Sequence, residues 1–217
     1  MFRALALTVV ACAACFGYGG FELTSSFVRL RTLNEKFTEL NRGWGGSEAF
    51  MYHGPLLWLG GHGGGFVSPV MLGGGGALGV KFGSADSLEA ELAGARAFLD
   101  AGYPYAPIDQ FWARGCLELG GGVWTHHIHY KESFSDSDFS RWWLGWAVGM
   151  APGIEVMGRI RYQSDMFAGI FLKASWFIPF TGPQSYGDSD PPAFGLGGFN
   201  LQVGLRFGKY PPRPFKM

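Results

Sequence analysis

The sequence predicts an all-β protein, an antiparallel up-and-down β-barrel of about 8–10 strands with one short N-terminal amphipathic helix. Three observations lead to this fold class. The chain of 217 residues contains 36 glycines, and aromatic residues make up 17% of it. Charged residues make up only 16%, against about 25% in ordinary soluble domains. Apolar side chains also alternate with a period of two over most of the second half, as they do in half-buried strands.

The glycines indicate a curved sheet and not a linker. They stand beside aromatic and aliphatic residues, whereas flexible linkers combine glycine with serine. Glycine within strands marks bends and places where two backbones approach closely, and a small closed barrel needs both. The formal net charge is zero and no basic stripe is present, so nucleic acid is not an expected partner.

The first elements are a strand and a helix. Residues 21–27 alternate in polarity and predict a strand. Residues 32–35 have the Thr-x-x-Glu pattern of a capping box, which predicts the start of a helix. Apolar residues at helical spacing and a glycine stop follow: Leu33, Phe37, Leu40 and Gly43. We expect the polar face of this helix to be in water, with Glu35, Lys36 and Glu39.

The middle of the chain is less regular. Glycine dominates residues 43–83, where we expect strands broken by bends. Residues 87–100 fit two periods, because Leu88, Leu92, Ala95 and Leu99 have helical spacing while Leu88, Ala90, Leu92 and Gly94 alternate as in a strand. We predict a strand here, since the segments around it are predicted sheet.

Alternation is clear from residue 112 onward, through residues 142–150 and 154–163. It is most regular in residues 199–207, where one face holds Phe199, Leu201, Val203, Leu205 and Phe207 and the other begins with Asn200, Gln202, Gly204 and Arg206. This length matches the about 9–11 residues that a tilted strand needs to cross a bilayer.

The connections differ in length. We predict short turns at 151–153, which reads Ala-Pro-Gly, and at 163–165, whereas the polar segments 131–140 and 181–195 are long. Long loops at one end and short turns at the other are typical of transmembrane barrels.

The N-terminus predicts export. Residues 1–15 contain Arg3, a short apolar run and small residues, as a secretory signal peptide does. Cleavage at the small-x-small site 11–13 and lipidation of Cys12 at a lipobox both remain open. Residues 16–208 then form a single barrel domain with a tail at 209–217. Cys116 would be the last cysteine of the mature chain and is expected to be a small buried hydrophobic residue.

From residue 112 to 208 the chain resembles a small bacterial outer-membrane β-barrel protein. Its last strand is similar to the outer-membrane assembly signal, polar-x-Gly-x-x-aromatic, which Gln202, Gly204 and Phe207 match. The resemblance implies a barrel in the outer membrane or at the cell surface. The stretch FELTSSFVRLRTLNEKFTELN, with the glycine-rich segments after it, also resembles a group of exported glycine-rich β proteins of thermophilic and anaerobic bacteria, and this second resemblance implies no activity.

Three motifs could carry chemistry, and each has a simpler interpretation. His127 and His129 would share one strand face and could chelate zinc or copper with Glu132, but a strand end at the membrane interface is expected, with no metal required. The Gly-x-Gly-x-x-Gly pattern at 74–79 lacks the helix that a dinucleotide site needs. The charged residues are expected to be paired in a narrow lumen and not catalytic: Arg114, Glu118, Glu155, Arg159 and Arg161.

The aromatic residues could form a ligand platform, but a membrane-interface girdle is expected for Trp124, Trp142, Trp143, Trp146, Tyr162 and Trp176. The leading hypothesis is therefore a non-enzymatic outer-membrane barrel without cofactor, in contact with the lipid bilayer, that stabilises the envelope or serves adhesion. A second is a secreted subunit that self-associates into an extracellular fibre or sheath. A third is a lipocalin-like binder of an apolar ligand. The first two put Phe199 and Leu201 outside, and the binder puts them inside.

Overall fold

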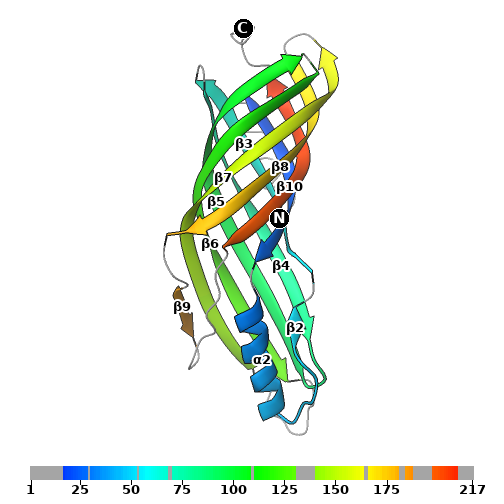
Figure 1. The fold of residues 1–217 in the computed structure, drawn as a ribbon, viewed down its shortest axis with the longest axis vertical. Helices are drawn as coiled ribbons and strands as arrows, with labels where there is room; N and C mark the ends of the chain where they lie inside the picture. Colours follow the sequence, from blue (N-terminus) through cyan, green and yellow to red (C-terminus); the bar gives the residue numbers. More distant parts are fainter. Residues whose placement is uncertain are drawn as a thin grey trace.

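Eight antiparallel strands close into a barrel in the computed structural model (Figure 1), which confirms the predicted fold class. The structure describes residues 17–28, 30–52, 54–67, 70–108, 110–130, 140–163, 166–180, 184–187 and 197–209. The barrel strands are β1 (Tyr18–Val28), β3 (Leu56–Val67), β4 (Val70–Ser84), β5 (Leu88–Ile108), β6 (Phe111–Tyr130), β7 (Ser140–Gln163), β8 (Met166–Pro179) and β10 (Gly198–Lys209). Outside the barrel order, helix α2 (Arg31–Gly43) and strand β2 (Met51–Tyr52) follow β1, and β9 (Gln184–Gly187) pairs with β7.

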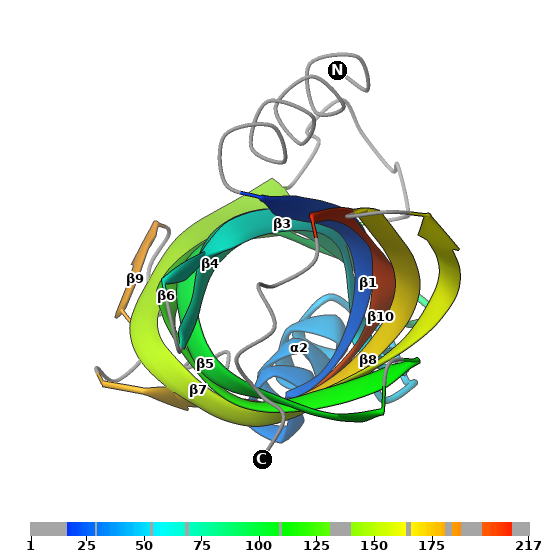
Figure 2. The same ribbon diagram turned by 90° about the horizontal axis from the view of Figure 1, so that it is seen from above.

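The barrel closes between its first and last strands. β1 pairs with both β3 and β10, so that Leu23 lies opposite Leu59 on one side and opposite Val203 on the other. The other neighbouring strands follow one another along the chain, and the ring is continuous when viewed along its axis (Figure 2). Each barrel strand therefore has hydrogen-bonded neighbours on both sides, which removes the unpaired edges of an open sheet.

Short and long connections lie at opposite ends of the barrel. At what we name the turn end, residues 68–69, 109–110 and 164–165 join the strands. At the opposite end, the loop end, the connections are 29–55, 131–139 and 180–197, together with the short link 85–87. The predicted asymmetry of connection lengths is confirmed.

The predicted turn at 151–153 is wrong, because these residues lie within the continuous strand β7. The β6–β7 ladder runs through them and pairs Pro152 with Leu117, while the β7–β8 ladder skips Ala151 and Pro152. Proline lacks a backbone N–H, and here the loss falls on one side of a strand that stays paired on the other. With this turn removed, strand directions alternate without exception around the barrel.

Helix α2 lies at the loop end, within the outline of the ring (Figures 1 and 2). As predicted, Leu33 and Phe37 are its buried apolar residues, and Glu35 and Glu39 are exposed. The predicted capping box is wrong, since Leu30 occupies the N-cap position and no side chain caps the helix. The chain enters the helix two residues after β1 ends, so the packing of the apolar face determines where the helix begins.

The helix also protects the edge of β2. The backbone N–H of Phe50 donates to Thr38 Oγ1 at 3.0 Å, and that of Tyr52 donates to Asn34 Oδ1 at 3.2 Å. Asn34 and Thr38 are one helical turn apart and accept from alternate N–H groups of the segment 50–52, which contains β2. An edge that would otherwise accept another strand is thereby closed.

The glycine-rich segment forms two long strands, β3 and β4, and not the broken strands that we expected. Glycine here makes room inside the narrow ring. A Cβ atom on Gly79 would lie 2.6 Å from the ring of Trp58, and one on Gly145 would lie 2.3 Å from Trp124. The predicted strand at 87–100 is confirmed as part of β5.

Two predicted segments lie outside the described residues: the signal peptide 1–15 with Cys12, and the tail from residue 210, since Lys209 still belongs to β10. Within the described residues, no helix has both the length and the apolar character that crossing a membrane requires.

Candidate functional site

The outer wall of the barrel is apolar around its whole circumference. Aliphatic residues from all eight strands point outward and are exposed, among them Leu23, Leu59, Leu78, Leu99, Leu119, Val148, Ile170 and Val203. Monomeric soluble proteins rarely expose so large an apolar surface, whereas a membrane-spanning barrel has an apolar band around its whole outer wall. The outer wall is that of a membrane-spanning β-barrel.

Exposed aromatic residues flank this band. Toward the turn end stand Tyr103, Tyr105 and Phe111, and toward the loop end stand Phe27, Phe82, Trp142, Trp176 and Phe199. Aromatic side chains gather at the two membrane–water interfaces of such barrels. The girdle is therefore present, with two of the predicted tryptophans in it. Trp146 is half-buried, and the side chain of Tyr162 is not among those that the structure describes.

Two other tryptophans were wrongly placed in the girdle. Trp124 and Trp143 are 2% and 1% exposed and point inward, where they pack with Phe37 of α2 in one apolar cluster. The ring of Phe37 stacks on that of Trp143 with centroids 6.1 Å apart. Composition could not distinguish these inward tryptophans from outward ones, although the alternation in 142–150 already placed Trp143 opposite Trp142.

The two faces of strand β10 can be compared with what each of the three functional hypotheses expects. Phe199, Leu201, Val203 and Leu205 are outward, and Asn200, Gln202 and Arg206 are buried inside. This is the arrangement that the membrane and fibre hypotheses expect and the opposite of the one that the lipocalin-like binder requires. The partner strand β1 repeats it, with Leu23 outside and Glu22 inside.

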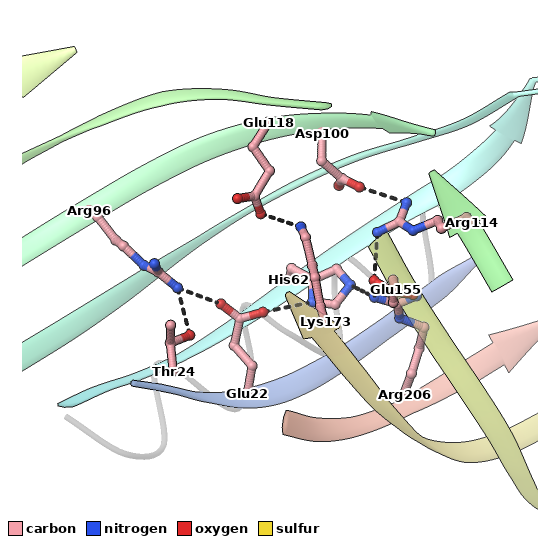
Figure 3. A network of polar contacts seen from close by, with 10 residues as sticks. All are labelled: Glu22, Thr24, His62, Arg96, Asp100, Arg114, Glu118, Glu155, Lys173 and Arg206. Atoms are coloured by element: carbon pink, nitrogen blue, oxygen red, sulfur yellow. Dashed lines mark hydrogen bonds and ion pairs between the residues drawn. The ribbon is translucent and has the colours of Figure 1, made fainter. Parts of the chain in front are cut away.

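The lumen contains a network of buried ion pairs (Figure 3). Glu155 lies at its centre and accepts hydrogen bonds from Nη2 of Arg114 and Nη2 of Arg206, each at 2.9 Å. Arg114 continues to Asp100, with Nη1 and Oδ2 2.6 Å apart. The Arg206 guanidinium also lies over three aromatic rings, of which Phe171 is nearest at 4.6 Å from the centroid.

His62 links this cluster to a second carboxylate. Its Nε2 is 2.5 Å from Nη2 of Arg206, and its Nδ1 is 3.2 Å from Glu22 Oε2. Because a guanidinium can only donate, Nε2 must accept, so the proton is on Nδ1 and faces Glu22. Glu22 also pairs with Arg96, at 3.2 Å. A chain of polar contacts thus runs from Arg96 to Asp100.

The network balances its charges. It contains four carboxylates and four basic groups: Glu22, Asp100, Glu118 and Glu155 with Arg96, Arg114, Lys173 and Arg206. Lys173 on β8 contacts Glu118 on β6, on the far side of the strand β7 that lies between them. The predicted pairing of Arg114, Glu118 and Glu155 inside the lumen is thus supported by their contacts. The side chain of Arg161 is not among those that the structure describes.

Of this set, sequence reasoning named only Arg114, Glu118 and Glu155 as paired charges of the lumen. Glu22, His62, Asp100 and Lys173 come from four strands far apart in the sequence, and no local motif joins them. A signal was present, however, because each stands in a strand at an inward position, opposite in parity to its apolar neighbours. In a strand whose outward positions are apolar, an isolated charged residue at an inward position indicates an ion pair in the lumen.

The two ends of the lumen are filled differently. Toward the loop end the apolar cluster around Leu33 and Phe37 includes Trp58, Leu88 and Ile128. Toward the turn end, a second apolar cluster, which includes Met71, Trp112, Met157 and Phe171, lies beside the ion pairs. Between them is a cavity of about 50 Å³, lined in part by Ser26, Arg96, Glu118 and Asn200. Such a volume holds a water molecule or two and is far below that of a ligand pocket.

The remaining predicted motifs are placed as follows. His127 and His129 point outward from β6 and His126 points inward, as the strand period predicted, while Glu132 lies outside the described residues. Among the described residues, no three His, Cys, Asp or Glu side chains converge to hold a metal ion. Residues 74–79 lie in strand β4, and the next element along the chain is strand β5, not the helix that a dinucleotide site needs. Cys116 is buried on the inner wall.

No protein-family model and no curated protein matches the chain. Solved structures of bacterial outer-membrane barrels do. A major outer membrane protein of Thermus thermophilus is 9% identical over 88% of this chain and 98% of its own, with a TM-score of 0.42. Acinetobacter baumannii CarO is 11% identical over 90% of this chain and 99% of its own, with a TM-score of 0.37. The N-terminal β-barrel domain of Pseudomonas aeruginosa OprF is 13% identical over 88% of this chain and 97% of its own, with a TM-score of 0.31. At these values the membrane assignment rests on the barrel's own surface.

Proposed function

We propose that this protein is a sealed, non-enzymatic outer-membrane barrel whose role is structural, and that it holds an ordered cap at the cell surface. The observation that carries the proposal is the charge-balanced network that crosses the lumen from Glu22 to Asp100. A conducting pore needs a continuous aqueous path, and the pair between Glu22 on β1 and Arg96 on β5, three strands away around the ring, spans that path.

The orientation follows from the connections. Outer-membrane barrels have short periplasmic turns and longer extracellular loops. The loop end, with α2 and β2, would therefore face the outside of the cell. There α2 closes the mouth with Leu33 and Phe37, and its outer face presents Arg31, Glu35 and Glu39 to solvent.

The cap is fastened to the barrel by polar contacts at Asp86 and at Tyr130. The carboxylate of Asp86, in the link between β4 and β5, accepts from Asn41 Nδ2 and from the Ser47 N–H, both at 2.6 Å. These hydrogen bonds hold the pKa of Asp86 well below its usual range. Tyr130 adds a hydrogen bond to the Trp44 carbonyl at 3.0 Å. Such fastening suits a fixed surface structure better than a moving gate.

An adhesive role is the second candidate, and one observation favours it. A surface groove of about 680 Å³ runs between α2 and the β2 segment, with Met51 on one side and Glu39 and Arg42 on the other. Its position at the loop end makes it accessible from outside the cell. The fibre hypothesis is less favoured, because self-assembly would use one or two faces and not a complete apolar band.

Conductance in planar lipid bilayers tests the sealed barrel. We expect the refolded wild type to give no stable channels. A variant that empties the lumen, Glu155→Ala with Arg206→Ala, should leak, and a control that shortens an outward side chain, Val203→Ala, should not. Stable wild-type channels of the size of a general porin would overturn the proposal. Flotation of the wild type with liposomes provides the independent check that it is inserted.

A further inference from the structure

The histidine motif gains two carboxylates from the neighbouring strand. In the β5–β6 register, Glu89 lies opposite His129 and Glu91 lies opposite His127. All four residues have outward parity, because Leu119 and Val123 on β6 and Leu99 on β5 are exposed on the same wall. Directly opposite residues of antiparallel strands have their Cβ atoms about 5 Å apart. The register therefore places two imidazoles and two carboxylates at the corners of one square, of which only His129 and Glu89 are in contact as the side chains stand.

One edge of this square is already in contact. His129 Nε2 is 3.1 Å from Glu89 Oε2, with both side chains about half exposed. Two ligands at about 2.0–2.2 Å from one tetrahedral ion lie roughly 3.3 Å apart, so these two atoms have nearly the separation that a shared ion requires. The rings of His127 and His129 have centroids 6.0 Å apart and are inclined by 33°. A change of side-chain rotamer at exposed His127 would bring in the third donor.

The surroundings favour a cation. The outward positions that flank the square in register are Ser84 and Phe82 on β4 and Ser140 and Trp142 on β7, and none of them is charged. Toward the turn end the next outward residues are Ala93 and Thr125, where the apolar band begins. The square thus stands at the outer boundary of that band, within reach of water.

We propose that Glu89, His127 and His129, with Glu91, form a surface site for a late first-row divalent metal ion, Zn²⁺ or Cu²⁺. Imidazole with carboxylate suits these ions, whereas Ca²⁺ and Mg²⁺ require oxygen ligands throughout. Folding does not depend on the site, because it lies outside the lumen and its strands are held by their ladders. The proposal is independent of whether the barrel is sealed.

Isothermal titration of the metal-free, tag-free protein in detergent with Zn²⁺ tests the site. We expect one equivalent to bind, with affinity reduced about tenfold or more in each of His127→Ala, His129→Ala and Glu89→Gln. Glu39→Gln on helix α2 is the matched control and should bind like the wild type. Heat-modifiable gel mobility should be the same for all variants, which separates loss of the site from loss of the fold.

Cu²⁺ gives an independent readout, because electron paramagnetic resonance reports nitrogen ligands directly. The spectrum of the wild type should show two, and that of either histidine variant should show one. The proposal is wrong if Zn²⁺ binding does not saturate, or if a stoichiometric ion remains in the His127→Ala, His129→Ala double variant. Equal affinity for Mg²⁺ would overturn the assignment of the metal class.

Discussion

Lysine on the outer wall should cost stability according to its depth in the bilayer. Val203 lies in the middle of β10 between outward Leu201 and Leu205, opposite Leu23 and Leu172. Val67 is the last residue of β3, beside a turn, and is also outward. A charge at the midplane of such barrels costs about 2–4 kcal/mol and one near the interface about 0–1 kcal/mol. Val203→Lys should therefore destabilise the barrel by about 2–4 kcal/mol, and Val67→Lys by at most about 1 kcal/mol.

The assay is denaturant unfolding in liposomes, followed by tryptophan fluorescence and by heat-modifiable gel mobility. The two variants make the same substitution, so differences in lysine propensity cancel. If Val203→Lys fails to fold, Val203→Ser tests the same position at lower cost and should rank between wild type and lysine. Equal losses at the two positions would contradict a lipid-facing wall, and a wild type that is folded and monomeric in water without lipid or detergent would refute it.

Three further predictions concern the lumen and the cap. Glu155→Gln leaves two buried guanidinium groups short of a carboxylate and should cost roughly 3–5 kcal/mol in denaturant unfolding, with no loss in Glu39→Gln. Because the pKa of Asp86 is lowered, its hydrogen bond to Asn41 should be fully present above the ordinary aspartate pKa of about 4 and should be lost only as the pH falls below that value. Proteolysis of residues 41–48 should therefore be slow at pH 5 in the wild type and fast at every pH in Asp86→Ala. Gly79→Leu drives a side chain into Trp58 and should abolish the heat-modifiable folded band, whereas Gly43→Leu, which meets open space, should keep it.

Much of the sheet was predictable because the strand period is local. Alternation in residues 199–207 and 21–27 assigned the two faces of β10 and β1 correctly, since consecutive side chains must point to opposite sides of a strand. The same rule placed His127 and His129 together and His126 apart. The helix was predictable from the spacing of Leu33 and Phe37, although its first residue was not.

Tertiary structure decided what no local pattern contains. Pro152 breaks an isolated strand, yet here it lies inside β7, because β6 keeps that strand paired on the other side. Trp143 resembles a girdle residue, yet it is buried, because α2 covers the inner wall at that height.

The ion pairs of the lumen and the square of Glu89, Glu91, His127 and His129 both result from how the strands are arranged around the ring. Closure of the ring brings Glu22 of the first strand within reach of charges from the middle of the chain, and the β5–β6 register supplies Glu89 to His129. The sequence by itself determined which face each side chain takes, because that depends only on the two-residue repeat of the backbone. Which side chains meet across the barrel was decided by strand order, register and closure, because these bring together residues that are far apart in the chain.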